Sequence, residues 1–303
     1  MAIRWHAGEV AIQRRAAKLE QGKTSVGMIR EAIPGIAVAF LSQQPMIVVA
    51  GRDGQEQMWV SVLAGEPGFL QVTDPRRLRV RSMLASSDPL AAAVATGGPF
   101  GTITLEPGTG RRMRINGTVV PAIGGFELQA EQVFSNCPKY ISERWPEAAG
   151  AAGAPQVVRG TQLTPAQALQ VQHADTFFIG TAHPDGPADA SHKAGNPGFV
   201  RVDAPDRLRW PDYIGNAMFM TLGNLSLDPR AGLLFIDWTT GGLLQLSGRA
   251  RVDWEPGSAA LLPGAQRVVE FCVDAVQESR DALALRWTSP VLSRFNPAFT
   301  VSV

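Results

Sequence analysis

One stretch of this sequence occurs twice, as GEPGFLQVTDPRRLR at residues 65–79 and as GNPGFVRVDAPDRLR at residues 195–209. The copies are identical at nine of fifteen positions and start 130 residues apart. A repeat of this length is a whole domain, because the units of solenoid proteins span only about 20 to 50 residues. The chain is therefore predicted to be a tandem duplication, in which two similar domains pack together and form a site between them.

Length and composition agree with two domains. The 303 residues exceed what one ordinary core uses. Charged residues make up 18% of the chain and apolar residues 45%, with 31 glycines and 22 prolines. Since charged residues normally reach about a quarter of a globular chain, we expect much surface to be buried between domains or subunits. This favours a homo-oligomer, specifically a homodimer.

Charge and cysteine usage argue against several classes of protein. A formal net charge of +1 gives no reason to expect nucleic-acid binding, because proteins that bind nucleic acid concentrate basic residues to neutralise its phosphates. The sequence shows no apolar run long enough for a membrane span and no secretory signal pattern. Cys137 and Cys272 fall in different repeats, so neither a disulfide framework nor a zinc site is supported. We expect a cytoplasmic protein without membrane or nucleic-acid partners.

Hydrophobic periodicity predicts similar elements in both repeats. An amphipathic helix is expected from Glu9 to about Glu20. Each repeat then shows a short helix, a buried strand, the GxPGF turn, a β-hairpin and a last strand. The helices are expected at 36–41 and 164–171, the first strands at 46–50 and 176–180, the hairpins at 100–119 and 233–252, and the last strands at 126–134 and 267–276.

Glycines mark matching positions in these predicted hairpins. Gly117 and Gly248 interrupt equivalent strands, which is typical of a bulge or a barrel corner. About six short strands per repeat, preceded by a helix, predict an α+β fold with a mostly antiparallel β-barrel core and peripheral helices. A doubly wound dinucleotide fold is disfavoured, because neither a GxGxxG nor a GxxxxGK[ST] motif is present.

The order of these motifs resembles the FMN-binding split barrel of the pyridoxamine 5'-phosphate oxidase-related family. Residues 188–193 (ADASHK) and 223–230 (GNLSLDPR) carry the resemblance most clearly. Residues 6–9 (HAGE), 59–65 (WVSVLAG) and 136–141 (NCPKYI) look like motifs of two-barrel members. The resemblance implies tandem split β-barrels.

The glycine- and alanine-rich run at residues 146–155 divides the two predicted barrels. We expect a helical arm at 1–30, a first, degenerate barrel at 31–145, a linker at 146–160 and a second, ligand-binding barrel at 161–303.

The resemblance implies FMN as the cofactor, held by the second barrel. FMN needs cations or hydroxyl donors for its phosphate, an apolar wall for its ring, and donors near the ring nitrogens. Ser191, His192 and Lys193 end a strand, with Ser191 and Lys193 on one face and His192 on the other. Either His192 or Lys193 could place positive charge at the cofactor. The alternative is a polar strand end that faces solvent.

The family also places phosphate and ring contacts in the region that corresponds to residues 211–224. Asn216, Thr221 and Asn224 are the candidate polar contacts, with Tyr213 and Ile214 beside the ring. A helix start in this region would favour an anion, although Asn216 could instead cap that helix. The chain departs from better-characterised oxidases at residues 219–221 (FMT), which are uncharged where those enzymes carry Arg and Lys.

Two further residues have open interpretations. Trp238 follows a predicted strand, where it either covers a ring face or fills the barrel mouth. Cys137 precedes a proline at an apparent helix start, a position that can lower a thiol pKa, so it is either reactive or a small buried residue. The first repeat has Trp59, Val62 and Leu63 where the second has Asp189, His192 and Lys193, and so we expect it to have lost the polar set.

The leading hypothesis is an FMN-dependent oxidoreductase that acts on a small-molecule substrate or electron donor. The sequence identifies no catalytic residue and no metal ligand set. Pyridoxamine 5'-phosphate oxidation itself is disfavoured, because the basic helix is missing. The alternatives are a flavin- or haem-binding protein without turnover, and an empty split barrel that serves as an interaction module. Haem is the weaker of these, because the chain has only four histidines.

Overall fold

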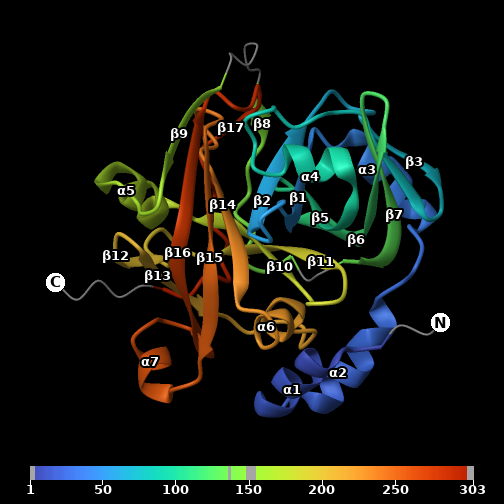
Figure 1. Cartoon of the computed structure of the whole chain (residues 1–303). Helices are drawn as coiled ribbons and strands as arrows, with labels where there is room; N and C mark the ends of the chain where they lie inside the picture. Colours follow the sequence, from blue (N-terminus) through green and yellow to red (C-terminus); the bar gives the residue numbers. More distant parts are fainter. Residues whose placement is uncertain (1–3, 136–137, 148–154, 299–303) are drawn as a thin grey trace.

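The computed structural model describes residues 4–135, 138–147 and 155–298, which form two antiparallel sheets with peripheral helices (Figure 1). The strand order of the first sheet is β2-β1-β5-β6-β7-β4-β3, and that of the second is β11-β10-β14-β15-β16-β13-β12. Every strand of the first sheet therefore has a counterpart in the second. The duplication visible at residues 65–79 and 195–209 extends to the whole topology, and the fold is the expected tandem pair of split barrels.

The strands of the two sheets have closely matched lengths. The first sheet comprises β1 (Met46–Arg52), β2 (Met58–Ala64), β3 (Leu70–Asp74), β4 (Arg77–Val80), β5 (Gly98–Glu106), β6 (Arg111–Ala122) and β7 (Gly125–Phe134). The second comprises β10 (Thr176–Ala182), β11 (Ala188–Ala194), β12 (Arg201–Ala204), β13 (Arg207–Asp212), β14 (Arg230–Ile236), β15 (Leu243–Asp253) and β16 (Arg267–Arg280).

The repeated GxPGF turn has the same stereochemical basis in both barrels. Gly68 and Gly198 have φ angles of 97° and 90°, in the left-handed region that favours glycine. A Cβ on Gly65 would lie 2.6 Å from the Phe69 ring, and one on Gly195 would lie 2.6 Å from the Phe199 ring. The glycines therefore let the chain turn and let each phenylalanine enter its barrel core.

The strand glycines lie at equivalent bulges, as the sequence predicts. The register between β6 and β7 shifts between Asn116 and Gly117, and that between β15 and β16 shifts between Ser247 and Gly248. A Cβ would lie 1.9 Å from a backbone oxygen of the neighbouring strand at Gly117 and 2.0 Å at Gly248. Only glycine allows this close approach, and the bulges bend both hairpins in the same way.

The helices lie around the sheets. They are α1 (Ala7–Arg15), α2 (Leu19–Ser25), the 3-10 turn η1 (Val26–Met28), α3 (Gly35–Gln43), α4 (Ala91–Thr96), α5 (Pro165–His173), α6 (Met220–Leu225) and α7 (Pro256–Ala260). Thr164 and Gln167 form a capping box at the start of α5. The single N-terminal helix expected from Glu9 to Glu20 is wrong, because the backbone turns left-handed at Ala17 (φ 54°) and divides it into α1 and α2.

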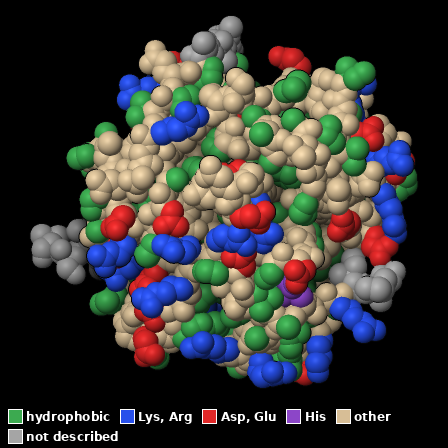
Figure 2. All heavy atoms as spheres, in the orientation of Figure 1, with side chains coloured by type: hydrophobic (Ala, Val, Ile, Leu, Met, Phe, Trp, Pro, Cys, Tyr) green, Lys and Arg blue, Asp and Glu red, His purple; other side chains and the backbone are tan. Residues whose placement is uncertain are grey.

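Two short strand pairs lie outside this symmetric plan. The segment 146–160, expected as a linker, contributes β8 (Pro146–Glu147), which pairs with β17 (Arg286–Trp287), and β9 (Gln156–Gly160), which pairs with β16. Among the described residues, no helix has the length and apolar character that a bilayer crossing requires. On the face shown in Figure 2, Lys and Arg side chains alternate with Asp and Glu rather than gathering into one basic patch.

The two barrels share a hydrophobic core. Strands β1, β2 and β5 of the first sheet pack on β10, β11 and β14 of the second. A Cβ on Gly101 would lie 2.4 Å from the Asp189 Cα, and one on Gly232 would lie 2.7 Å from the Met58 oxygen. Glycines on both sides therefore bring the backbones together, and Phe178 and Leu234 are fully buried in the shared core.

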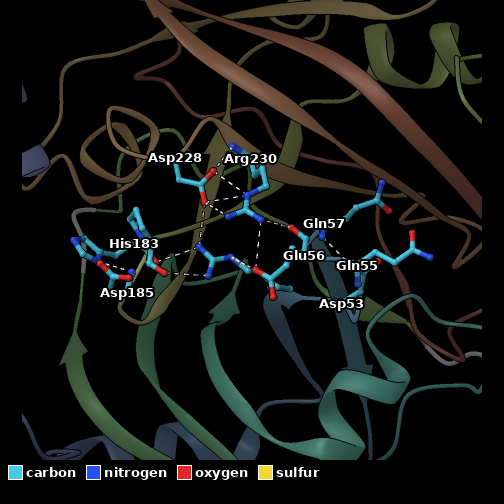
Figure 3. A network of polar contacts seen from close by, with 10 residues as sticks. Asp53, Gln55, Glu56, Gln57, His183, Asp185, Asp228 and Arg230 are labelled. Atoms are coloured by element: carbon cyan, nitrogen blue, oxygen red, sulfur yellow. Dashed lines mark hydrogen bonds and ion pairs between the residues drawn. The ribbon is translucent and has the colours of Figure 1, made fainter.

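An ionic network also joins the barrels (Figure 3). Arg52, at the end of β1, donates to Asp228 at 3.1 Å and to the His183 carbonyl at 3.2 Å. Arg230 donates to the same carboxylate at 2.8 Å and to the Glu56 carbonyl at 3.0 Å. One carboxylate of the second barrel therefore holds arginines from both.

Candidate functional site

A cavity of about 240 Å³ lies between the two barrels. The second barrel contributes the end of β11 and the segment from the end of β13 into α6, and the first contributes β5, β6 and the segment after β7. Its polar and aromatic lining comprises Arg112, Arg114, Lys139, Tyr140, Ser191, His192, Lys193, Phe199, Asp212, Tyr213, Asn216, Phe219 and Thr221. Each barrel therefore supplies part of the polar wall.

The cavity is rich in positive charge. Arg112, Arg114 and Lys139 from the first barrel and Lys193 from the second line it, against the single carboxylate of Asp212. The Arg114 guanidinium is already engaged in a buried ion pair with Asp189. Guanidinium and ammonium groups bind phosphate and carboxylate oxygens well, so the cavity suits an anionic ligand.

His192 is a neutral hydrogen-bonding group in this wall. Burial, with Arg112, Arg144 and Lys193 nearby, holds the pKa of His192 well below its usual range. Its Nδ1 lies 3.4 Å from an Arg112 nitrogen, which can only donate, so Nδ1 accepts and Nε2 carries the proton. Nε2 is buried without a hydrogen-bond partner among the described residues. His192 therefore offers one unused N–H donor, and the cation on this strand is Lys193.

Lys193 belongs to a chain of charges. Its Nζ lies 3.4 Å from one oxygen of Asp212, and an Arg267 nitrogen lies 2.9 Å from the other. Arg267 is 7% exposed and its guanidinium also packs over the Phe219 ring at 5.0 Å. Asp212 therefore orients one cation that lines the cavity and one that lies behind it.

Two tyrosines, one from each side, form a second edge of the cavity. The rings of Tyr140 and Tyr213 lie 5.1 Å apart, and the Tyr140 hydroxyl donates to the Ile214 carbonyl at 3.2 Å. Burial, reinforced by Tyr140, raises the pKa of Tyr213, so its phenol stays protonated. The Tyr213 hydroxyl is buried and has no partner among the described residues.

Most of the residues predicted from sequence lie at this cavity. Seven of the predicted residues line it, namely Ser191, His192, Lys193, Tyr213, Ile214, Asn216 and Thr221. Asn216 does not cap α6, because that helix begins at Met220 after Phe219; its Oδ1 instead accepts from the Met218 N–H at 3.1 Å. Ser191 and Thr221 are buried and border the cavity. That these residues hold a ligand remains a prediction.

Two predicted residues lie elsewhere. Asn224 is a buried residue of α6 outside the cavity lining, where its amide donates to Thr181 and its oxygen lies 3.1 Å from His6 Nε2, so it fastens the N-terminal segment. Trp238 packs edge-on against Trp287 at 5.0 Å and under the Arg144 guanidinium, away from the cavity lining. Of the two interpretations of Trp238, the structure therefore favours packing.

The contribution of the first barrel is what sequence reasoning missed. Arg112 and Arg114 are two residues apart on β6, so both side chains lie on one face of the strand. Lys139 and Tyr140 follow β7. The basic run RRMR at 111–114 was the available signal, but it lies in the barrel expected to have lost its polar set. The cations that the α6 segment lacks are supplied from across the seam.

A second cavity lies at the position that the duplication makes equivalent, but its lining residues differ in polarity. A cavity of about 230 Å³ is lined by Val62, Leu63, Ser82 and Leu243. These are the counterparts of His192, Lys193, Asp212 and Arg112, because β2, β4 and β15 match β11, β13 and β6. Ser82 lies just after β4, and Asp212 ends β13. The loss of polar residues expected for Val62 and Leu63 therefore concerns this second cavity.

Cys137 lies outside the described residues, and Cys272 is a free, exposed thiol. Within the described ranges, no group of three or more His, Cys, Asp or Glu side chains is arranged to hold a metal ion.

The second barrel matches a known protein family. The family model of pyridoxamine 5'-phosphate oxidase matches residues 163–288, which span α5 to β17. No curated protein matches the chain.

Similar solved structures include HupZ from Group A Streptococcus (11% identity, 37% of this chain and 90% of that chain, TM-score 0.31). A Clostridium acetobutylicum protein of the pyridoxinephosphate oxidase family, related to general stress protein 26, has 13% identity over 40% and 89% of the chains, with a TM-score of 0.28. An FAD-binding protein from Mesorhizobium loti has 12% identity over 41% and 97%, with a TM-score of 0.28. The second barrel, at residues 163–288, therefore matches the pyridoxamine 5'-phosphate oxidase family.

Proposed function

We propose that the cavity between the barrels binds FMN and that the protein is a flavin-dependent oxidoreductase acting on a small molecule. The observation that carries this proposal is the cationic wall made by both barrels, in which Arg112 and Lys139 face the segment of the second barrel that matches the oxidase family. These cations supply what a phosphate needs and what the uncharged segment at residues 219–221 does not.

The remaining cavity groups also suit a flavin. Arg112, Lys139 and Lys193 would hold the phosphate or a negative charge on the reduced ring. The N–H of His192 and the hydroxyl of Tyr213 are buried donors without partners in the part of the chain that the structure describes, and an unpaired buried donor costs about 1 to 3 kcal/mol. An acceptor on a bound ring would remove that cost. Met218 and Phe219 add apolar surface.

The cofactor would supply the electron transfer, and the protein's part is to bind and orient it. Lys193, held by Asp212, keeps a positive charge at the cavity edge. His192 stays neutral and protonated at Nε2, so it can donate a hydrogen bond but holds no second proton to give. The cavity would therefore stabilise negative charge on a bound flavin through Lys193 and donate a hydrogen bond to it from His192.

The absorbance spectrum of the purified protein tests the proposal first. Bands near roughly 370 and 450 nm indicate flavin, a Soret band indicates haem, and neither indicates an empty barrel. Apoprotein should then be titrated with FMN and with riboflavin, which lacks the phosphate. Tighter binding of FMN is expected. Replacing His192 and Lys193 together should release bound FMN, and unchanged retention would reject this site.

A further inference from the structure

One wall of the cavity has a backbone conformation that needs outside support. Ala217 and Phe219, both in the cavity lining, have φ angles of 62° and 56°. Neither is glycine, and the Cβ of an L-residue clashes with its own backbone in this conformation, so it is strained. Ala217 and Phe219 therefore keep this conformation only where contacts around residues 216–219 hold them.

The N-terminal arm, residues 4–29, makes those contacts without lining the cavity itself. Gln13 is fully buried on α1, and its Nε2 lies 3.3 Å from the Ala217 carbonyl oxygen and 3.4 Å from that of Met218. Ser25 Oγ, at the end of α2, lies 2.8 Å from the Asn216 carbonyl oxygen. Three successive carbonyls of the wall are thus fixed by two side chains of the arm.

Glycines bring the arm close enough for these hydrogen bonds. A Cβ on Gly8 would lie 2.3 Å from the Gly223 oxygen of α6, and one on Gly223 would lie 2.6 Å from Glu9 Cγ. A Cβ on Gly22 would lie 2.4 Å from the Gln13 amide carbon. Helix α1 therefore packs directly on α6 (Figure 1), and α2 closes over the Gln13 side chain.

Apolar contacts complete the docking. Ile29 packs with Met218 and Met220 in a small core that Trp5 also contacts, while the Trp5 indole donates to the Gly22 carbonyl at 2.8 Å. Met218 and Met220 both line the cavity. The arm and a ligand in the cavity would therefore contact the same short segment.

We propose that the N-terminal arm is a strap that sets the shape of the cavity wall, with Gln13 as its central positioning residue. Undocking the arm releases Ala217 and Phe219 from their left-handed conformation and removes the cavity in its present form. Because coupling between two sites is reciprocal, a ligand in the cavity also tightens arm docking. The ligand part of this inference rests on the proposed function, whereas the support of the wall does not.

Hydrogen exchange of the full-length protein without ligand tests the support of the wall. Gln13→Met keeps most of the side-chain volume but removes the amide, and Ser25→Ala removes the hydroxyl. The matched control is Gln21→Met, since Gln21 lies on the same arm with an exposed side chain. Faster exchange at 216–222 in Gln13→Met and in Ser25→Ala, with no change in the control, is expected. Unchanged exchange at 216–222 in both variants, with the fold intact by circular dichroism, overturns the proposal.

Titration with FMN tests the coupling. Gln13→Met should bind FMN about tenfold more weakly than the wild type, equivalent to about 1.4 kcal/mol, while Gln21→Met binds normally. Saturating FMN should slow exchange in α1 and α2 of the wild type. Equal FMN affinity in the Gln13 and Gln21 variants would contradict the strap. If the wild type binds no FMN, the proposed function fails, and the exchange experiment still decides whether the arm holds the wall.

Discussion

Arg114 of the first barrel and Asp189 of the second form an ion pair that is almost completely removed from solvent. The side chains are 5% and 3% exposed, and Asn116 also donates to the same carboxylate oxygen at 3.1 Å. The pair crosses the seam beside the cavity and thereby links the structure of the site to the packing of the two barrels.

Breaking this pair should destabilise the protein strongly. Arg114→Met leaves the Asp189 carboxylate buried and uncompensated, for which about 3 to 5 kcal/mol is expected in the free energy of unfolding. Denaturant unfolding measures the loss. The control is Arg251→Met, because Arg251 is 80% exposed where it meets Glu270 and should change stability by less than about 1 kcal/mol. Equal losses in the two variants would mean that the barrel seam does not depend on this pair.

Arg112 should act on the phosphate of the proposed ligand. Arg112→Gln is expected to weaken FMN binding by about 10- to 100-fold, in line with about 1.5 to 3 kcal/mol for a charged hydrogen bond, with riboflavin binding nearly unchanged. Arg111→Gln is the control. Arg111 precedes Arg112 in the sequence, but it is exposed, pairs with Glu106 and does not line the cavity. Titration followed by flavin fluorescence measures both. An equal loss for riboflavin would argue against a phosphate contact.

Glu9 should make docking of the arm sensitive to alkaline pH. Burial raises the pKa of Glu9 to about 8, with the Asp189 charge adding to the rise. The docked state therefore holds a proton that the undocked state releases, so its stabilisation is present at low pH and declines as pH rises toward 8. Burial lowers the pKa of His6 to about 4, which opposes this trend only below its ordinary value of 6.5.

Between about pH 6.5 and 8 the Glu9 effect should therefore dominate, with a loss of up to about 2 kcal/mol in unfolding free energy. Glu9→Gln, which can still accept from the His6 N–H, should remove this decline. Glu20→Gln tests an exposed carboxylate of the same arm and should leave the pH profile as it is. Denaturant unfolding at about pH 6.5 and pH 8 gives the comparison. A decline that persists in Glu9→Gln would assign the proton to another group.

Asp228 should contribute to stability against acid. Burial alone would raise the pKa of Asp228, but hydrogen bonds from Arg230 and the charges of Arg230 and Arg52 hold it below the usual range. A carboxyl with a lowered pKa stabilises the folded state above its unfolded pKa, and this stabilisation is lost as pH falls through the folded value. Asp228→Asn should therefore lower the Tm at pH 7 more than at pH 3. A constant difference across this range would show that the Asp228 charge does not matter.

Much of the fold could be predicted because its signals are local. The GxPGF turns, the strand glycines and the helix start at Thr164 and Pro165 can each be recognised from a few residues, and the repetition of the turns and glycines indicates the duplication. The helix break at Ala17 carries no such signal, because alanine favours continuing a helix and contacts with α6 and within the arm decide its conformation.

The site was predictable only in the half that resembles a known family. The sequence pointed to residues that line the cavity in the second barrel, namely Ser191, His192, Lys193, Tyr213, Ile214, Asn216 and Thr221. Arg112 and Lys139 join them by packing of one barrel on the other, which no local spacing encodes. Asn224 was misplaced for the same reason: its neighbour His6 is 218 residues away in sequence.

Fusion of the two barrels in one chain has a consequence for how the seam can change. In a symmetric pair of separate subunits, every substitution appears in both copies, so a residue that improves one hollow alters the other identically. Here His192 and Val62 stand at matching positions and differ freely. One polypeptide can therefore keep a basic cavity in one place and a mostly apolar cavity in the other, and a mutation in either leaves the sequence of its counterpart unchanged.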